Sequence, residues 1–484
     1  MNILFVHLPT VPLIELRKKR TGKFTDLYIP LSIPLGITYL SAVLKKETTH
    51  TVGLLDLMVD IDTIQEYPSV GHYFMSKIQS VPFVPDVVLI SLTFSCSYDS
   101  FDFILTLIKK KWKACQVIAG GNHATATAEI LKDDPRIDTI VAGEGEAVIV
   151  ELVEHLSRFG KIVRPGLIDN LDSIPFPDFD LLNIEKYLTH GRTYVKAETG
   201  QRIGTIITSR GCPFRCTYCA SHVVHGRKMR YRSVENVMDE ITNLIERYQI
   251  NQLDFADDTL FLDEKRILTI LEAIRSKFPQ LKVSFPNVLS VNLTTPELID
   301  VMVQCGVVDF VFAVESGSPF TQKHIINKNV DLKKAKSLIE YIRINYPDVN
   351  ARCTCLLGFP GETKELIQES IDGVKALQPD WIVFLMVTPL PGSVIHQQFV
   401  NEGYIKNTPE FWINTHIRTR QFDTKEISAK ELRDIQRNNN IEYNMRQNPN
   451  LTTNPEKAKR FFQHLLEKYP QHRVAKEMMD MLKK

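Results

Sequence analysis

The sequence predicts an α/β protein with a doubly wound N-terminal domain, a central partial (β/α)6 barrel and a helical C-terminal segment. Short apolar strands alternate with helical stretches over residues 1–157 and again over 201–400, and such alternation is typical of parallel sheets. Residues 158–200 are expected to be a connector, and residues 401–484 to be helical. At roughly 150 residues per domain, 484 residues correspond to about three such parts.

Five strands are expected in the N-terminal domain, at residues 2–8, 51–57, 86–92, 116–119 and 139–142, with helices at 35–46 and 101–112. A parallel sheet of this kind binds ligands at the carboxyl ends of its strands. Glycines and hydroxyl side chains lie at these ends: Ser91, Thr93, Gly120, Gly121, Gly143 and Gly145. Because no G-x-G-x-x-G follows the first strand, the pattern favours a flat cofactor over a dinucleotide. Tight turns and helix caps are the alternative roles of these residues.

The connector contains the sequence Ile-Pro-Phe-Pro at residues 174–177, which disfavours a helix there. Six strand candidates follow it, at residues 203–208, 252–255, 283–285, 310–314, 352–357 and 381–387. Six strands with intervening helices predict a parallel, incomplete barrel. The chemistry of such a barrel is expected on the loops that follow its strands.

Composition and charge exclude several classes of protein. Hydrophobic residues make up 44% and charged residues 24% of the chain, which is typical of globular domains rather than disordered or fibrous chains. The net charge of 58 − 57 = +1 leaves no overall electrostatic footprint for DNA or RNA, so nucleic acid is not an expected partner. Apolar runs such as 381–387 are too short to span a membrane, and the N-terminus lacks the basic region of a signal peptide. We therefore expect a cytoplasmic protein.

Three of the eight cysteines, Cys212, Cys216 and Cys219, follow the first barrel strand with the spacing C-x3-C-x2-C. Three thiolates on one loop can each ligate one iron of a [4Fe–4S] cube, which leaves the fourth iron open to a chelating substrate. The alternatives are structural zinc, with His222 as a fourth ligand, and cysteines without a ligand. Zinc is disfavoured because structural zinc sites usually draw their ligands from two separated pairs. The other five cysteines follow no metal spacing and are expected to pack as apolar residues.

This cysteine loop resembles that of the radical S-adenosylmethionine (SAM) enzymes. The resemblance implies that the open iron chelates the amino and carboxylate groups of SAM, and that one electron cleaves its C–S bond to a 5′-deoxyadenosyl radical. Later strand ends resemble the family's SAM-binding segments, which implies SAM contacts from Tyr218, Asp257, Glu315, Ser316 and Gly358. A helix cap at Asp257, a buried ion pair at Glu315 and a plain turn at Gly358 are the structural alternatives.

The chain as a whole is similar to the cobalamin-binding radical SAM enzymes, and in particular to their class B methyltransferases. The similarity rests on the N-terminal domain, including residues 34–44, on the connector, and on the Thr-Pro-Leu-Pro-Gly-Ser segment at 388–393. It implies that the six strand-end residues named above line a cobalamin site. One departure is that none of the 13 histidines has an Asp two residues before it, so the D-x-H-x-x-G motif is absent. We therefore expect cobalamin without a histidine on cobalt.

The resemblance implies methyl transfer to an unactivated carbon of a small molecule or peptide, with an electron donor such as a flavodoxin or ferredoxin. Radical cyclisation or rearrangement without methyl transfer is the alternative reaction, and a non-catalytic cobalamin or iron–sulfur sensor is the alternative class. A tRNA methylthiotransferase is disfavoured, because such families carry a second cysteine triad in the N-terminal domain. Here that domain has only Cys96 and Cys115.

Overall fold

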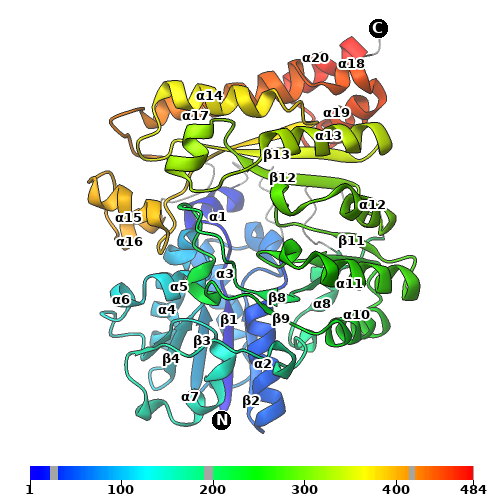
Figure 1. The fold of residues 1–484 in the computed structure, drawn as a ribbon. Coiled ribbons are helices and arrows are strands. Elements are labelled where there is room, and N and C mark those ends of the chain that lie inside the picture. Colours follow the sequence, from blue (N-terminus) through cyan, green and yellow to red (C-terminus); the bar gives the residue numbers. More distant parts are fainter. Residues whose placement is uncertain (22–30, 190–199, 414–419, 483–484) are drawn as a thin grey trace.

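The computed structural model describes residues 1–21, 31–189, 200–413 and 420–482 (Figure 1). Its N-terminal domain contains a six-stranded parallel sheet in the order β2-β1-β3-β4-β5-β6. The strands are β1 (Asn2–His7), β2 (Thr51–Asp56), β3 (Val87–Ser91), β4 (Gln116–Gly120), β5 (Thr139–Val141) and β6 (Ile162–Val163). All five expected strands are present. The sixth, β6, lies beyond residue 157 in the segment expected to be a connector, and two residues are too few to be recognised by pattern.

Helices cover both faces of this sheet, which explains why β1 is apolar at consecutive positions. Ile3 and Phe5 pack under α2 and α7, whereas Leu4 and Val6 belong to the larger core under α3 and α4. The helices of the domain are α1 (Leu13–Arg20), α2 (Leu35–Glu47), α3 (Val70–Gln79), α4 (Tyr98–Lys111), α5 (Asn122–Ala126), α6 (Ala128–Leu131) and α7 (Ile149–Glu154). Both faces of the sheet are therefore buried.

The barrel contains all six expected strands, which form two parallel sheets of three in the orders β11-β10-β7 and β12-β13-β14. An isolated parallel bridge pairs Leu289, in the segment after β11, with Phe312 of β12. The strands are β7 (Ile203–Ile206), β10 (Gln252–Phe255), β11 (Lys282–Ser284), β12 (Asp309–Glu315), β13 (Asn350–Leu357) and β14 (Trp381–Met386). Among the described residues, β14 and β7 do not pair, so the barrel is partial, as predicted.

Helices alternate with the barrel strands, and a short antiparallel ribbon lies after the first strand. The helices are α9 (His222–His225), α10 (Val234–Tyr248), α11 (Glu264–Lys277), α12 (Pro296–Gln304), α13 (Leu332–Asn345) and α14 (Lys364–Lys375). The ribbon pairs β8 (Ser209–Arg210) with β9 (Arg230–Tyr231) and encloses the cysteine loop. The connector contains α8 (Ile184–Thr189), and its residues 190–199 lie outside the described part of the chain.

The C-terminal segment is helical, as predicted, and contacts both preceding parts. Its helices are α16 (Pro409–Ile413), α17 (Ala429–Ile441), α18 (Asn450–Thr453), α19 (Pro455–Lys468) and α20 (Arg473–Leu482), and α15 (Val394–Asn401) precedes them inside the range expected for the barrel. Asn440 and Asn444 hydrogen-bond the backbone of β14 and so cover this barrel edge. Trp412 of α16 packs between Tyr98 and His123 of the N-terminal domain. Figure 1 shows the N-terminal domain at the bottom and α18–α20 at the top.

No helix in the described ranges is both long and apolar enough to cross a membrane.

Candidate functional site

The three cysteines line a cavity of about 460 Å³ at the mouth of the barrel. The loop that carries them turns at Gly211, whose φ of +99° is in the left-handed region. A Cβ atom at this position would collide with the carbonyl oxygen of Lys228, so only glycine fits. The three thiols are free and partly buried. The local sequence therefore presents three thiols on one short loop to a single cavity.

The donor set of this loop fits an iron–sulfur cube. Three thiols lie on one short loop and line one cavity. A [4Fe–4S] cube places each thiolate on a different iron, so three protein thiolates leave the fourth iron open to another ligand.

Glu315, at the end of β12, faces the same cavity with one oxygen left unpaired. Its Oε1 accepts hydrogen bonds from the Tyr218 hydroxyl (3.2 Å) and from Lys328 Nζ (3.3 Å). Its Oε2 is buried and has no hydrogen-bond partner among the described residues. The backbone of Glu315 has a φ of +67°, which is strained for a residue with a side chain. A buried unpaired oxygen on a strained backbone at a cavity wall fits a ligand that donates an N–H or O–H.

Asp257 lines the cavity, but its carboxylate is already occupied. It accepts hydrogen bonds from the Thr208 amide (3.0 Å), the Thr208 hydroxyl (2.9 Å) and the Ser209 hydroxyl (2.6 Å). Burial raises the pKa of Asp257, although these hydrogen bonds oppose the shift. The neighbouring Asp258 exposes its side chain and has no hydrogen bond recorded among the described residues. Asp257 therefore supports the chain just before the cysteine loop, and Asp258 is the carboxylate available to a ligand.

Two of the residues predicted to contact SAM, Ser316 and Gly358, are not among those that line this cavity. The Ser316 hydroxyl is buried and hydrogen-bonds the Ser370 hydroxyl at 2.7 Å. The Gly358 amide donates to Glu362 Oε2 at 2.7 Å, and its carbonyl accepts from Arg420 at 2.6 Å. The structure thus brings Tyr218, Asp257 and Glu315 together with the cysteines around one cavity, and Ser316 and Gly358 do not line it.

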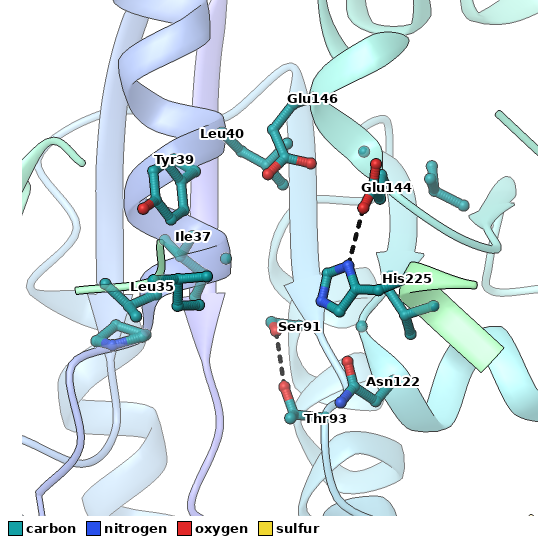
Figure 2. A pocket seen from close by; sticks show the side chains of 18 of the residues that line it. Leu35, Ile37, Tyr39, Leu40, Ser91, Thr93, Asn122, Glu144, Glu146 and His225 are labelled. Atoms are coloured by element: carbon teal, nitrogen blue, oxygen red, sulfur yellow. Dashed lines mark hydrogen bonds and ion pairs between the residues drawn. The ribbon is translucent and has the colours of Figure 1, made fainter. Parts of the chain in front are cut away.

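A second cavity, of about 420 Å³, lies at the carboxyl edge of the N-terminal sheet. All six residues predicted there line it: Ser91, Thr93, Gly120, Gly121, Gly143 and Gly145. The sheet order reverses between β1 and β3, and ligands of doubly wound sheets bind at such a switch point. A side chain at Gly121, whose φ is +100°, would meet the Leu92 carbonyl at 2.8 Å. Figure 2 shows Ser91 and Thr93 between Tyr39 on one side and His225 on the other. We call this space the switch-point cavity.

The barrel closes the switch-point cavity through a buried ionic network, the domain seam, formed by Glu144, Glu146, Arg210, His225 and Arg230. Glu144 accepts hydrogen bonds from both terminal nitrogens of Arg230 (2.7 Å each) and from His225 (2.9 Å). Arg210 pairs with Glu146 at 2.6 Å. Burial alone would raise the pKa of Glu144, but the hydrogen bonds from His225 and Arg230 outweigh it and hold the pKa well below its usual range. The seam therefore joins the β8–β9 ribbon of the barrel to the loop after β5 of the N-terminal sheet through ion pairs.

The two cavities meet at the carboxyl ends of the first barrel strands. Ser221, Asp257 and Asp258 line both of them. A molecule bound at this junction would lie between whatever is bound in the barrel cavity and whatever is bound in the switch-point cavity.

Comparison with known proteins identifies the family. The profile of the radical SAM superfamily matches residues 206–373, and that of the B12 binding domain matches residues 31–153. The chain is 32% identical to the uncharacterized methyltransferase PH0819 of Pyrococcus horikoshii, over 81% of this chain and 82% of the relative. The chain belongs to the cobalamin-binding radical SAM enzymes. The cofactors of this family are a [4Fe–4S] cluster, SAM and cobalamin.

Other members of the superfamily show its range. The anaerobic magnesium-protoporphyrin IX monomethyl ester cyclase of Cereibacter sphaeroides is 24% identical over 75% of this chain and 60% of its own length. Among solved structures, the radical SAM methyltransferase TsrM of Kitasatospora setae superposes with a TM-score of 0.60. That match covers 84% of this chain and 79% of TsrM at 17% identity, so it shows the common fold. The fold is that of a cobalamin-binding radical SAM enzyme.

Sequence reasoning missed the residues of the domain seam and Lys328. A usable signal was present in the sequence: two glutamates in the Gly-Glu-Gly-Glu run at 143–146, and basic residues around the cysteines. Because buried charges are almost always paired, these two groups could have been predicted to form ion pairs with each other. Lys328 follows no motif, and only the structure places its ammonium group beside Glu315.

Proposed function

We propose that this protein is a cobalamin-dependent methyltransferase that methylates an unactivated carbon of a small molecule or peptide. The observation that carries the proposal is the junction, where Ser221, Asp257 and Asp258 line both cavities. When bound, the cluster and SAM supply the radical chemistry and cobalamin supplies the methyl group. A substrate at the junction would be within reach of both, and the protein's part is to hold it there.

In the barrel cavity, we propose that Cys212, Cys216 and Cys219 hold the cluster. Glu315 Oε2 would accept a hydrogen bond from SAM, because it is a buried oxygen of a cavity-lining residue and has no partner among the described residues. Burial raises the pKa of Tyr218, so its hydroxyl keeps the proton that it donates to Glu315. The aromatic side chains of the wall, Phe255, Phe261 and Phe285, limit the access of water to the reacting atoms.

In the switch-point cavity, we propose that cobalamin lies against the six strand-end residues. Glycine at positions 120, 121, 143 and 145 lets a flat ring approach the backbone closely, and the hydroxyls of Ser91 and Thr93 can hydrogen-bond its polar edge. The domain seam keeps the barrel above this cavity, which sets the distance between the two cofactors.

We propose a flavodoxin or ferredoxin as the electron donor, because the cysteine loop exposes Phe214 and Arg215 at the surface. An apolar and a basic side chain next to the cluster ligands suit the acidic surfaces of such donors.

The decisive experiment separates methyl transfer from the alternatives. The anaerobically reduced, cobalamin-loaded enzyme is incubated with SAM that carries a deuterated methyl group and with a small-molecule and peptide extract of the source cells. We expect 5′-deoxyadenosine, S-adenosylhomocysteine and a product with the deuterated methyl group. Ring closure or rearrangement, which the cyclase relative favours, would yield 5′-deoxyadenosine and a new product without the label. A sensor would yield neither nucleoside, and this outcome would contradict the proposal.

The cluster assignment is tested by metal content. Wild-type protein reconstituted without oxygen should hold about four irons per chain. The triple variant Cys212→Ala, Cys216→Ala, Cys219→Ala should hold none, whereas Cys96→Ala, outside the loop, should match the wild type. Four irons in the triple variant would show that other residues hold the cluster.

A further inference from the structure

The barrel cavity has walls of two different kinds. Its charged side chains Glu315 and Lys328 both hydrogen-bond the Tyr218 hydroxyl, on the cysteine loop. The loops after β10 and β11 contribute large apolar side chains to the same cavity: Leu260, Phe261, Phe285, Val288 and Leu293. We call these side chains the apolar wall. The groups that suit a charged cofactor and those that suit an apolar ligand therefore come from different elements.

Aromatic contacts hold the apolar wall in place. The Phe285 ring stacks on Phe255, at the end of β10, with 5.5 Å between ring centroids. The edge contact between Phe285 and Phe261 has a centroid distance of 5.2 Å. Because these rings come from two successive strand ends, the wall is a packed surface that exists before any ligand binds.

The amide side chains of the same loops are used to brace the backbone. Asn287 donates to the carbonyl oxygens of Ala256 (3.0 Å) and Asp257 (2.8 Å), so it ties the loop after β11 to the loop after β10. Asn292 donates to the carbonyl oxygen of Asn329 at 2.8 Å. These amide donors are therefore engaged with the protein, and what the wall mainly offers a ligand is apolar surface.

Apolar side chains also remain exposed at this cavity. Val288 is 44% exposed and Phe214, on the cysteine loop, is 43% exposed, and both line the cavity. A single exposed apolar side chain is normal in a protein. Here two of them border a cavity whose inner surface is apolar as well, and such a combination is typical of a ligand site. Removing these side chains from water favours a ligand with apolar surface of its own.

We propose that the substrate is a small molecule with an uncharged, apolar body that lies against the apolar wall, with its reacting carbon at the junction of the two cavities. The inference rests on the proposed function and narrows its substrate from a small molecule or peptide to an apolar small molecule. A peptide backbone would lose water from its N–H and C=O groups against this wall without gaining partners, which is unfavourable. A hydrocarbon chain or an aromatic ring system carries no such cost.

The first test uses the neutral fluorophore N-phenyl-1-naphthylamine, whose emission rises when it leaves water. The wild-type enzyme is loaded with cluster, cobalamin and saturating SAM, and we expect it to bind the probe. Val288→Asp places a charge on the apolar wall and should weaken probe binding about tenfold. Val308→Asp is the matched control, because Val308 is 55% exposed and does not line the cavity, and it should bind the probe as the wild type does. Equal iron content in the three proteins would show that each is folded.

Competition identifies the kind of apolar body. Displacement of the probe by 1-dodecanol favours a hydrocarbon chain, and displacement by 2-naphthylmethanol favours an aromatic ring system; either supports the proposal. A wild-type enzyme that binds the probe only without SAM would show that SAM itself covers the apolar wall, and this would overturn the inference. Absence of probe binding, or an equal loss in Val308→Asp, would do the same.

The second test locates the methylated product. The enzyme is incubated with SAM that carries a deuterated methyl group and with cell extract that has been separated into an organic phase and an aqueous phase containing the peptides. We expect the label in a product of the organic phase, and about tenfold less of it with Val288→Asp than with Val308→Asp. Label in the aqueous phase alone would overturn the apolar substrate and leave methyl transfer standing. Absence of labelled product from both phases would count against the proposed function, whereas the probe experiment would still decide whether the wall binds apolar molecules.

Discussion

The domain seam and the mouth of the barrel each contain a buried glutamate, and the two differ in how their oxygens are satisfied. In the seam, both oxygens of Glu144 accept hydrogen bonds, from Arg230, from His225 and from the Ile168 amide. At the barrel mouth, Oε1 of Glu315 accepts hydrogen bonds, whereas Oε2 has no partner in the part of the chain that the structure describes. A fully paired carboxylate contributes to holding the fold, whereas a buried oxygen without a partner has a free energy cost that a ligand can remove. The comparison therefore assigns Glu144 a structural role and Glu315 a role in ligand binding.

The largest expected effect is in the seam. Glu144→Gln would leave the buried guanidinium of Arg230 without its carboxylate, which should lower the free energy of unfolding by about 3 kcal/mol. The measurement is chemical or thermal unfolding of the protein without cofactors. Glu129→Gln is the matched control, because Glu129 also pairs with two cations but is exposed, and its unfolding midpoint should not move. Equal midpoints for the two variants would show that the seam does not stabilise the fold.

The next effect distinguishes two adjacent aspartates. Asp257→Asn loses an acceptor for Thr208 and Ser209 and should lower the free energy of unfolding by about 2 kcal/mol. Asp258→Asn should leave stability unchanged and reduce the rate of 5′-deoxyadenosine formation, because its side chain faces the junction of the cavities. Parallel unfolding and SAM-cleavage assays on both variants test this. A stability loss in Asp258→Asn, with none in Asp257→Asn, would reverse the assignment.

A smaller effect is expected at the barrel mouth, and it concerns binding. Glu315→Gln replaces an acceptor oxygen with an amide nitrogen, so the dissociation constant of SAM should rise about tenfold. Isothermal titration of the reconstituted enzyme measures it, with the exposed Glu340→Gln on α13 as control. Iron content and the unfolding midpoint should stay at the wild-type values. Unchanged SAM affinity together with lower stability would place Glu315 with Glu144, as a structural carboxylate.

The smallest effect is a pH dependence at a third buried glutamate, Glu362, on the loop after β13. Burial raises its pKa to about 7 from the ordinary 4.5 of a glutamate, against the hydrogen bonds from Gly358, Phe359 and Ser370. Because its folded-state pKa is raised, its contribution to stability is fully present below pH 4.5 and is lost as the pH rises to about 7. Glu362→Gln should flatten this part of the stability curve. A wild-type slope that persists in the variant would assign the titration to another group.

Local patterns predicted most of the fold and the short segment that carries the three cysteines. The strands were predictable because a strand buried on both faces is a continuous apolar run, as at β1 and β14. The cysteine loop was predictable because all three ligands lie within one short segment. β6 was not, because a two-residue edge strand leaves no pattern. Ser316 and Asp257 were assigned by position after a strand, but the direction of a side chain depends on the backbone and on neighbouring groups.

The sequence by itself determined the two domains, the cysteine spacing and the sheet edge at which the strand-end glycines gather, since each depends on residues close together in the chain. The tertiary structure decided which charged groups are paired and which are free. Glu144 and Arg230 are 86 residues apart, and Asp56 and Tyr187 are 131 apart. Such pairs form only when separate elements pack, because a buried charge has to find its partner across the fold. For that reason the buried Glu315 oxygen that has no partner among the described residues could be found only in three dimensions.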